Sequence, residues 1–408
     1  MVARGHLLAA RRRGKRNGGR PGSDGRTVEA WPGDLRAHGP QIRAARRAGT
    51  YRPSPAKRVA IPTPGGGVRQ LGRPTGLDRV LQQARLQVRQ PEWDTTCSES
   101  REGFRPGGSA HQAGAQAQRS LGAGDGWGVD LDLEQCVDRV NHDTRMRLVK
   151  KRVADRRVLQ RIDRSLKAGA GTDAGVEATV EGTPPGGPRS PLWAHRRLDG
   201  LDKAWERRGH RFVRDAEEGH SYVKSLRAGQ RGRARVTRFL ARRLTLRVNA
   251  AKRAVDRPWR RPLLGCTCTG HGPNRRRVRE KALKACTHEG RRVTSRTRGG
   301  SWGRVVGDVR RYLEGWYVYC GFTEAPACVK ELDSWIGRRR RGSLGKPWGR
   351  RRDRERRRRG VSRDLAGNTV KSAHGPWRLS HRPALAIALP GSDCEGLGLP
   401  RLHPRSRR

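Results

Sequence analysis

The sequence predicts an α+β fold in which a small antiparallel sheet is followed by a helical region. Residues 129–133 form a short apolar run typical of a strand, and residues 211–213 and 221–223 have the composition of two hairpin arms. Beyond residue 273 the pattern becomes helical, because apolar residues between Val305 and Trp316 recur at helical spacing. The two periodicities occupy different parts of the chain, which indicates a sheet-containing part and a helical part.

The other elements follow from the same patterns. Residues 58–71 are predicted to form a hairpin, because two short apolar runs flank a Gly-rich turn. Apolar residues at helical spacing predict a helix that begins near Asp78 and ends before Pro91. We also expect a basic extension over residues 1–50, a helix capped by residues 141–143, helices over 192–205 and 236–244, and a short strand over 244–248.

The charge of the chain indicates a polyanionic partner. Its 408 residues, enough for two or three domains, include 91 Lys and Arg against 38 Asp and Glu, a formal net charge of +53. Such a charge repels itself unless phosphates neutralise it, so nucleic acid is the expected partner. An anionic membrane is the weaker alternative, because no window approaches the roughly 20 apolar residues of a membrane span. Residues 1–17 lack the apolar core of a secretory signal, and we expect a cytoplasmic protein.

The cysteines are expected to be small buried side chains in a reducing compartment. The eight are scattered along the chain, and only 33% of residues are hydrophobic, so the core is expected to be thin. Cys266 and Cys268 with Cys286 and His288 could be drawn as a zinc site, but Cys-x-Cys is tighter than the usual ligand spacing. We therefore expect no zinc.

Two acidic motifs carry the chemical signal. Residues 128–143 (GVDLDLEQCVDRVNHD) and 211–218 (RFVRDAEE) each place carboxylates at the end of a short apolar run, and the second motif forms a hairpin tip at residues 216–219. A Gly/Pro-rich segment, residues 181–191, lies between them. This order is the layout of a polymerase palm, where carboxylates of neighbouring strands hold divalent metals against a nucleoside triphosphate.

Taken with these motifs, the chain resembles the reverse transcriptase/maturase proteins encoded in bacterial group II introns, most like the short type without an endonuclease domain. The resemblance implies a right-hand polymerase-like fold, with fingers and an antiparallel palm sheet followed by an α-helical thumb (the maturase domain) and a basic tail. It implies a basic extension (1–50), fingers and palm (51–270), thumb (271–345) and an Arg-rich DNA/RNA-binding tail (346–408), which we expect to be partly disordered. Eight segments carry it in order: 49–55, 103–111, 129–143, 182–188, 207–213, 248–252, 312–316 and 360–366.

The resemblance implies a two-magnesium site, with Mn²⁺ as an alternative, held by Asp132, Glu217 and Glu218. Relatives carry Tyr-Ala-Asp-Asp where this chain has residues 215–218, Asp-Ala-Glu-Glu. Each glutamate stem is one methylene longer, and a displacement of about 1 Å can cost on the order of 100-fold in rate. We therefore expect polymerase activity to be impaired. Asp130, two residues before Asp132, is interpreted as a hydrogen-bonded structural acid.

The resemblance also assigns nucleotide-binding positions. Arg69 is expected to hold the triphosphate, while Thr63 stands where a lysine is common. Pro185 and Gly186 lie in the loop that contacts the incoming nucleotide. Two further positions have alternatives: Val137 either relaxes sugar selectivity or reflects drift, and Lys252 lies either near the pyrophosphate or on a solvated surface.

The helical region is expected to bind RNA. Arg304, Arg310 and Arg311 are predicted to face outward and contact phosphates, and Tyr312 and Trp316 to face the core. The arginine runs 338–341, 350–352 and 356–359 predict a solvated, RNA-contacting tail, in which Trp348 and Trp377 either stack on bases or pack on the domain. No pair of Cys-x-x-Cys motifs follows the predicted thumb, so we do not expect the zinc-dependent endonuclease of longer relatives.

Three hypotheses about the protein remain open at this point. The first is an RNA-directed DNA polymerase that uses Mg²⁺, deoxynucleoside triphosphates, intron RNA and a DNA target or primer. The second is a splicing cofactor that binds intron RNA without polymerising, and the third is a decayed gene product. A retron-type reverse transcriptase is a lesser alternative.

Overall fold

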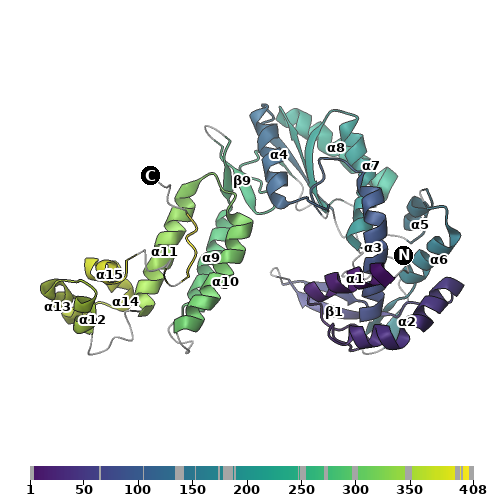
Figure 1. Cartoon of the computed structure of the whole chain (residues 1–408). Coiled ribbons are helices and arrows are strands. Elements are labelled where there is room, and N and C mark those ends of the chain that lie inside the picture. Colours follow the sequence, from purple (N-terminus) through teal and green to yellow (C-terminus); the bar gives the residue numbers. More distant parts are fainter. Residues whose placement is uncertain are drawn as a thin grey trace. The chain divides into compact units, whose positions relative to one another are not determined.

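The computed structural model divides the chain into two compact units, residues 1–256 and 257–408 (Figure 1). It describes residues 4–403 except the following: 64–65, 104, 134–141, 152, 173–174, 178–186, 188–189, 247, 249–253, 271–273, 296–301, 345–351, 391–395 and 397. Asn141, part of the predicted helix cap at 141–143, lies outside the described residues.

The first part of the N-terminal unit packs helices α1 (Arg4–Arg16), α2 (Trp31–Ala48) and α3 (Gly76–Asp94) near a small sheet. That sheet has the order β2-β1-β4-β5, and the pair β1–β2 at one side of it is the predicted hairpin. Its strands are β1 (Ala56–Pro62), β2 (Val68–Arg73), β4 (Ala170–Thr172) and β5 (Gly175–Glu177). Trp31 and Val80 are buried between α2 and α3.

Two expectations for this part were wrong or incomplete. Pro91 lies inside α3 rather than after it, close enough to the C-terminus that few backbone hydrogen bonds are affected. The basic extension contains α1 and α2, whose apolar residues are too few to give a clear periodicity.

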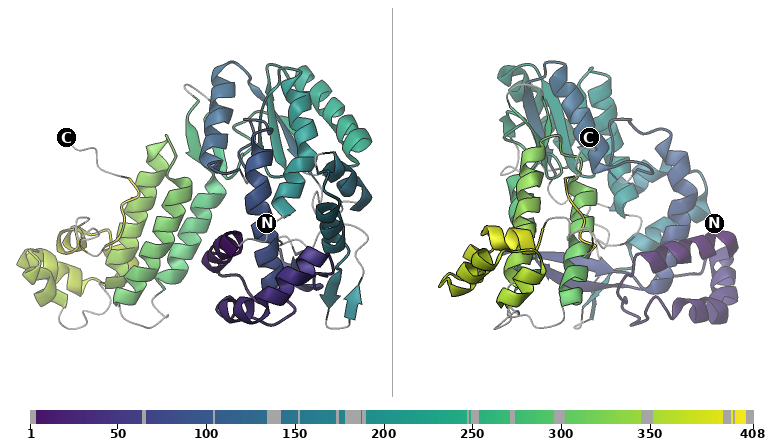
Figure 2. Two further views of the ribbon diagram at one scale, coloured as in Figure 1. Left: turned by 45° about the vertical axis from the view of Figure 1, so that its right-hand side comes forward. Right: turned by 60° about the vertical axis from the view of Figure 1, so that its left-hand side comes forward.

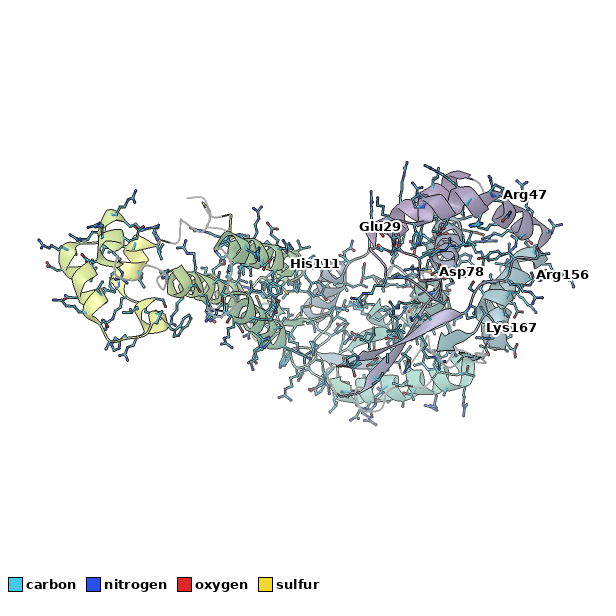
Figure 3. All side chains as sticks on the ribbon, turned by 90° about the horizontal axis from the view of Figure 1, so that it is seen from below. Glu29, Arg47, Asp78, His111, Arg156 and Lys167 are labelled. Atoms are coloured by element: carbon cyan, nitrogen blue, oxygen red, sulfur yellow. The ribbon has the colours of Figure 1, made fainter. Side chains whose placement is uncertain are left out.

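In Figure 3, Arg47 on α2 and Arg156 and Lys167 of the α6 segment project outward, and all three side chains are exposed.

The palm sheet is antiparallel, with the order β6-β7-β3-β8. Its strands are β3 (Trp127–Asp132), β6 (Arg211–Asp215), β7 (Glu218–Val223) and β8 (Ala254–Asp256). Helices α4 (Ala110–Gly122), α7 (Ser190–Glu206) and α8 (Leu226–Leu244) accompany it (Figure 1). A core beneath the sheet includes Leu131, Leu198, Trp205, Phe212 and Leu240.

The sequence therefore predicted the palm hairpin, although its strands are longer and its turn shorter than expected. The turn consists of residues 216–217 alone. The strand predicted over 244–248 was wrong, because α8 continues to Leu244 and, in the described part of that stretch, Val248 makes an isolated bridge to Leu133. Helices α5 (His142–Lys150) and α6 (Arg156–Leu166) form a separate small core with Trp93.

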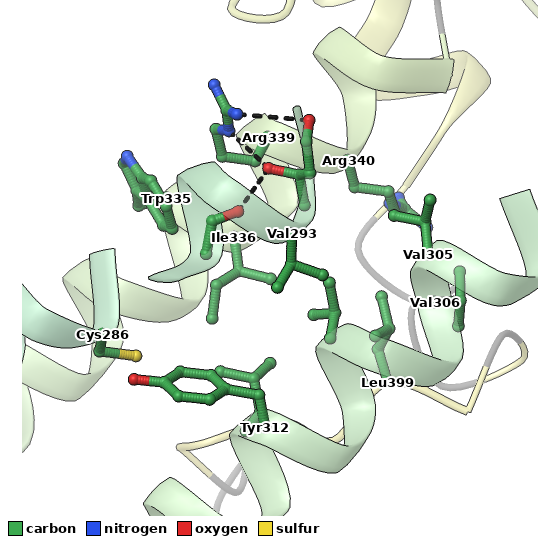
Figure 4. A pocket seen from close by; sticks show the side chains of 14 residues that line it. Cys286, Val293, Val305, Val306, Tyr312, Trp335, Ile336, Arg339, Arg340 and Leu399 are labelled. Atoms are coloured by element: carbon green, nitrogen blue, oxygen red, sulfur yellow. Dashed lines mark hydrogen bonds between the residues drawn. The ribbon is translucent and has the colours of Figure 1, made fainter. Parts of the chain in front are cut away.

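The C-terminal unit is built on three long helices that lie side by side (Figure 2). They are α9 (Glu280–Val293), α10 (Trp302–Cys320) and α11 (Pro326–Leu344), and the hairpin of β9 (Cys266–Cys268) and β10 (Arg276–Val278) precedes them. The predicted stripe of α10, including Tyr312 and Trp316, packs in the core of this bundle as expected. A small cavity, partly open to solvent, lies between the helices and is lined mainly by apolar side chains such as Val293, Tyr312 and Ile336 (Figure 4).

The arginine run 338–341 is not a solvated tail. It forms the last turns of α11, and three of its four guanidinium groups donate to oxygen atoms near the ends of other helices. Arg339 donates to the Thr294 hydroxyl after α9 (3.0 Å). Arg340 donates to the Leu389 and Pro390 carbonyls (2.8 and 2.6 Å), and Arg341 donates to the Ser380 carbonyl (2.9 Å). Because helix C-termini carry partial negative charge, they stabilise these cations.

These contacts hold a small helical subdomain against α11. It comprises α12 (Arg352–Arg358), α13 (Arg363–Lys371), α14 (Pro376–Leu379) and α15 (Pro383–Ala388), and it has its own apolar core. Trp377 of α14 has the Arg338 guanidinium 4.0 Å and the Arg339 guanidinium 5.8 Å from its ring centre. Of the two interpretations of Trp377, packing against the domain is the one the structure supports. In the described part of the chain, no helix is long and apolar enough to cross a membrane.

Candidate active site

The palm sheet places three carboxylate residues in one row across three strands. Asp132, the last residue of β3, lies directly opposite Glu218, the first residue of β7, and Glu218 lies opposite Asp215, the last residue of β6. Directly opposed residues of an antiparallel pair project from the same face, with Cα atoms about 4.5–5.5 Å apart. Asp132 and Glu218 are therefore neighbours on one face of the sheet.

Glu217 occupies the turn that joins β6 to β7. The preceding residue, Ala216, has a φ of 51°, in the left-handed region that an alanine rarely adopts. Glu217 is half-buried and Glu218 is exposed. Among the described residues, no three acidic, histidine or cysteine side chains come close enough to hold one metal ion. The structure thus brings Asp132 to Glu218, whereas the convergence of all three acids stays a prediction.

The donor chemistry of this row fits magnesium. Mg²⁺ prefers hard oxygen ligands and is usually held by one or two carboxylates together with water and substrate phosphates. Asp132 and Glu218 supply two such carboxylates from adjacent strands. The flexible stem of an exposed glutamate allows the Glu218 carboxylate to change direction without moving the backbone.

Asp130 lies one layer deeper on the same face and is buried. The Nδ1 atom of His220 is 2.9 Å from its Oδ1 atom, and the two residues are direct partners between β3 and β7. This contact is a close approach without hydrogen-bond geometry at Oδ1, so the interpretation of Asp130 as a hydrogen-bonded structural acid stays a prediction.

Asp215 packs against the loop that carries the 103–111 motif. A Cβ atom at Gly103 would overlap the Asp215 carboxylate and crowd the Ala216 nitrogen, so this close approach requires glycine. Burial raises the pKa of Asp215, while the neighbouring Arg214 guanidinium opposes the rise. The residue that replaces the family's tyrosine is thus directed toward the loop.

Arg214 lies beneath the turn, and its guanidinium group is almost fully buried. It forms a two-pronged ion pair with Asp202 of α7, in which its Nε atom donates to Oδ1 at 2.6 Å and Nη2 donates to Oδ2. Its Nη1 atom donates to the Ala216 carbonyl at 2.7 Å. The sequence analysis did not identify Arg214, Asp202 or His220. One signal in the sequence could have identified Asp202: it is an acidic residue next to Leu201, on the apolar side of a predicted helix, where an acid needs a partner.

The other predicted nucleotide-binding residues lie mostly outside the described residues. Val137, Pro185, Gly186 and Lys252 all fall there. Arg69 is on β2, opposite Ile61 of β1. In the adjoining turn, the Thr63 hydroxyl donates to the Gly67 carbonyl at 2.9 Å.

The predicted RNA-binding arginines lie on α10 and are exposed as expected. The Nε atom of Arg310 is 2.7 Å from Glu314, and Nη1 of Arg311 is 3.4 Å from Asp308, in ion pairs within the helix. Exposed pairs of this kind contribute little to stability, so phosphates can compete for both guanidinium groups. Arg304 is exposed near the start of the helix, and Trp348 lies outside the described residues.

Three cysteines near the start of the C-terminal unit are largely shielded from water. Cys266 and Cys286 are buried, and burial raises the pKa of Cys266 to about 11 and that of Cys286 to about 12. Burial also raises the pKa of Cys268 to about 11. These thiols remain protonated at neutral pH.

Comparisons with known proteins agree with this geometry. The reverse transcriptase (RNA-dependent DNA polymerase) family matches residues 61–268, and the group II intron maturase-specific domain matches residues 283–360. The chain therefore belongs to the reverse transcriptase family. It belongs to the family of group II intron reverse transcriptase/maturase proteins.

Relatives at the level of whole proteins match over shorter stretches. Protein YkfC of Escherichia coli K12 is 34% identical over 160 residues, which is 38% of this chain and 42% of YkfC. The group II intron-encoded protein LtrA of Lactococcus lactis is 33% identical over 171 residues, 42% of this chain and 28% of LtrA. The chain thus spans less than half the length of these curated relatives. A solved telomerase from Candida albicans, in complex with a telomeric RNA fragment, aligns with a TM-score of 0.45 at 9% identity, covering 80% of this chain and 64% of the telomerase.

Proposed function

We propose that the protein binds group II intron RNA, assists its splicing and copies it into DNA by two-metal nucleotidyl transfer. The observation that carries the proposal is the direct opposition of Asp132 and Glu218 at the ends of the two inner strands of the palm sheet. Its partners are intron RNA, a DNA target or primer and deoxynucleoside triphosphates, and the proposed location is the cytoplasm. The proposed divisions are the extension (1–50), fingers and palm (51–270), thumb (271–345) and nucleic-acid-binding C-terminal part (346–408).

In this proposal Asp132, Glu217 and Glu218 bind two Mg²⁺ ions, for which Mn²⁺ can substitute. When bound, such ions activate the primer hydroxyl and neutralise charge on the departing pyrophosphate. Arg69 orients the triphosphate by its planar fork of donors, and Lys252 lies near the pyrophosphate. Val137, Pro185 and Gly186 border the nucleotide, while Arg304, Arg310 and Arg311 hold the RNA backbone.

Primer extension on an RNA template tests the polymerase function. We expect slow extension that depends on Mg²⁺ or Mn²⁺ and stops when EDTA removes the metal. A chain that binds RNA but adds no nucleotide with either metal would contradict it.

A splicing cofactor without polymerase activity is the second candidate. It is favoured by the two lengthened acids and by the absence, among the described residues, of three metal-binding side chains in contact range. Self-splicing of the RNA that flanks the gene, measured with and without the protein, tests this role. Acceleration of splicing without primer extension would establish the second candidate, whereas no effect on splicing would exclude it.

A further inference from the structure

The β6–β7 turn is supported from below by one buried side chain. Arg214 is on the opposite face of β6 from Asp215, and the side chains of Arg214 and Asp202 are each 1% exposed. Two nitrogens of the guanidinium engage Asp202, and a third donates to the carbonyl of Ala216, the first residue of the turn. The guanidinium therefore links the turn to helix α7.

The backbone of Arg214 is fixed as well. Its N–H donates to the Ser100 carbonyl at 2.9 Å, and its carbonyl accepts from the Glu102 N–H at 3.0 Å. The loop at residues 98–103 thus pairs with the outer edge of β6, and Gly103 closes over Asp215. Arg214 is therefore held by three neighbours: Asp202, the Ala216 carbonyl and the loop at residues 98–103.

This support matters because the turn itself is in an unfavourable conformation. Ala216 has a positive φ, which costs free energy for a residue with a Cβ atom. Such a conformation persists only where surrounding contacts enforce it. The contact to its carbonyl comes from Arg214, and the next two residues are Glu217 and Glu218.

We propose that Arg214, held in place by Asp202, is a positioning residue. It fixes the position of the Glu217 and Glu218 carboxylates relative to Asp132, and so determines the affinity of the site for metal. The inference rests on the proposed function, because it takes these acids as the metal ligands. Arg214 does not touch the metal; it acts through the Ala216 carbonyl. Groups that orient metal ligands typically affect metal affinity or activity by about 10- to 100-fold.

Mn²⁺ binding, followed by electron paramagnetic resonance on the full chain with an RNA–primer duplex, tests the proposal without requiring turnover. The Arg214→Lys variant keeps the charge but loses the planar fork. We expect it to bind Mn²⁺ about tenfold more weakly, with unchanged affinity for the duplex. The matched control is Arg211→Lys, since Arg211 begins the same strand and pairs with Asp125 at 3.1 Å, away from the turn. It should bind Mn²⁺ like the unaltered chain.

A second variant separates positioning from folding. Replacing the pair by apolar residues, Arg214→Met with Asp202→Leu, removes the buried charges together and is expected to preserve the thermal unfolding midpoint. It should still weaken Mn²⁺ binding, because the bond to the Ala216 carbonyl is lost. Unchanged Mn²⁺ affinity in both variants, or equal weakening in Arg211→Lys, would overturn the role of Arg214.

The Asp132→Ala variant distinguishes this failure from a failure of the proposed function. If Asp132→Ala binds Mn²⁺ normally, the metal site and the role of Arg214 both fail. If Asp132→Ala loses Mn²⁺ but the Arg214 variants do not, only the role of Arg214 fails. If all of them lose Mn²⁺ and the unaltered chain extends no primer, the role of Arg214 stands and the polymerase function fails.

Discussion

Shortening the two glutamates at the β6–β7 turn is expected to accelerate nucleotide addition. Glu218 lies directly opposite Asp132, so their Cα atoms are about 5 Å apart and their carboxylates share one face. A glutamate stem carries its carboxylate about 1.3 Å farther from the backbone than an aspartate stem. Mg²⁺ accepts ligands only at about 2.0–2.1 Å in nearly regular octahedra, so an error of this size strains the site.

The variant Glu217→Asp with Glu218→Asp should therefore raise kcat by about 10- to 100-fold. The KM for the RNA template should stay unchanged, because the substitution alters an interaction that matters in the transition state. Single-turnover primer extension at saturating Mg²⁺ measures the change. The control is Glu206→Asp, the same substitution at an exposed position at the end of α7. Extension no faster in the double variant than in Glu206→Asp would refute the reasoning.

Three further predictions concern the C-terminal unit. Trp377→Ala removes the ring that the Arg338 and Arg339 guanidinium groups approach, and it should destabilise docking of the α12–α15 subdomain by about 1–2 kcal/mol. Faster hydrogen exchange in α14 and α15 would show this loss, and unchanged exchange would exclude the packing role. Replacing Arg310 and Arg311 by alanine should reduce the salt dependence of RNA binding. In filter binding, the magnitude of the slope of log RNA affinity against log salt concentration should fall by about 2. An unaltered slope would mean that neither arginine contacts phosphate. Burial raises the pKa of Cys286 to about 12, so this thiol is protonated at pH 8 and should resist alkylation until denaturant is added. Mass spectrometry detects the labelling, and rapid labelling of the native chain would contradict the burial of Cys286.

The sequence predicted correctly several elements that have an apolar pattern with a period of two or 3.6 residues. The strand that ends at Asp132 and the stripe of α10 that contains Trp316 are examples. The short alternating stretch 244–248 was misleading, because its first residue ends a helix. The opposition of Asp132 and Glu218 was predictable only through the family resemblance, because strand register depends on pairing between distant segments. Periodicity alone does not specify which residues face each other.

Arginine was the main source of error. A run such as 338–341 has the composition of a solvated tail, and hydropathy does not reveal a carbonyl acceptor that comes from another helix. Arg340 is only 2% exposed, yet it is satisfied in part by the carbonyls after α15. Arg214 is similar, because its partner Asp202 lies on a helix whose packing against the sheet is a tertiary feature.

The most direct test of the central claim is RNA-templated primer extension by the Asp132→Ala variant, measured beside its affinity for the same RNA. Loss of all extension with intact RNA binding is the predicted result, since the proposed function assigns Asp132 to the metal site and the arginines to RNA binding. Persistent extension, or a parallel loss of RNA affinity, would contradict the assignment of Asp132.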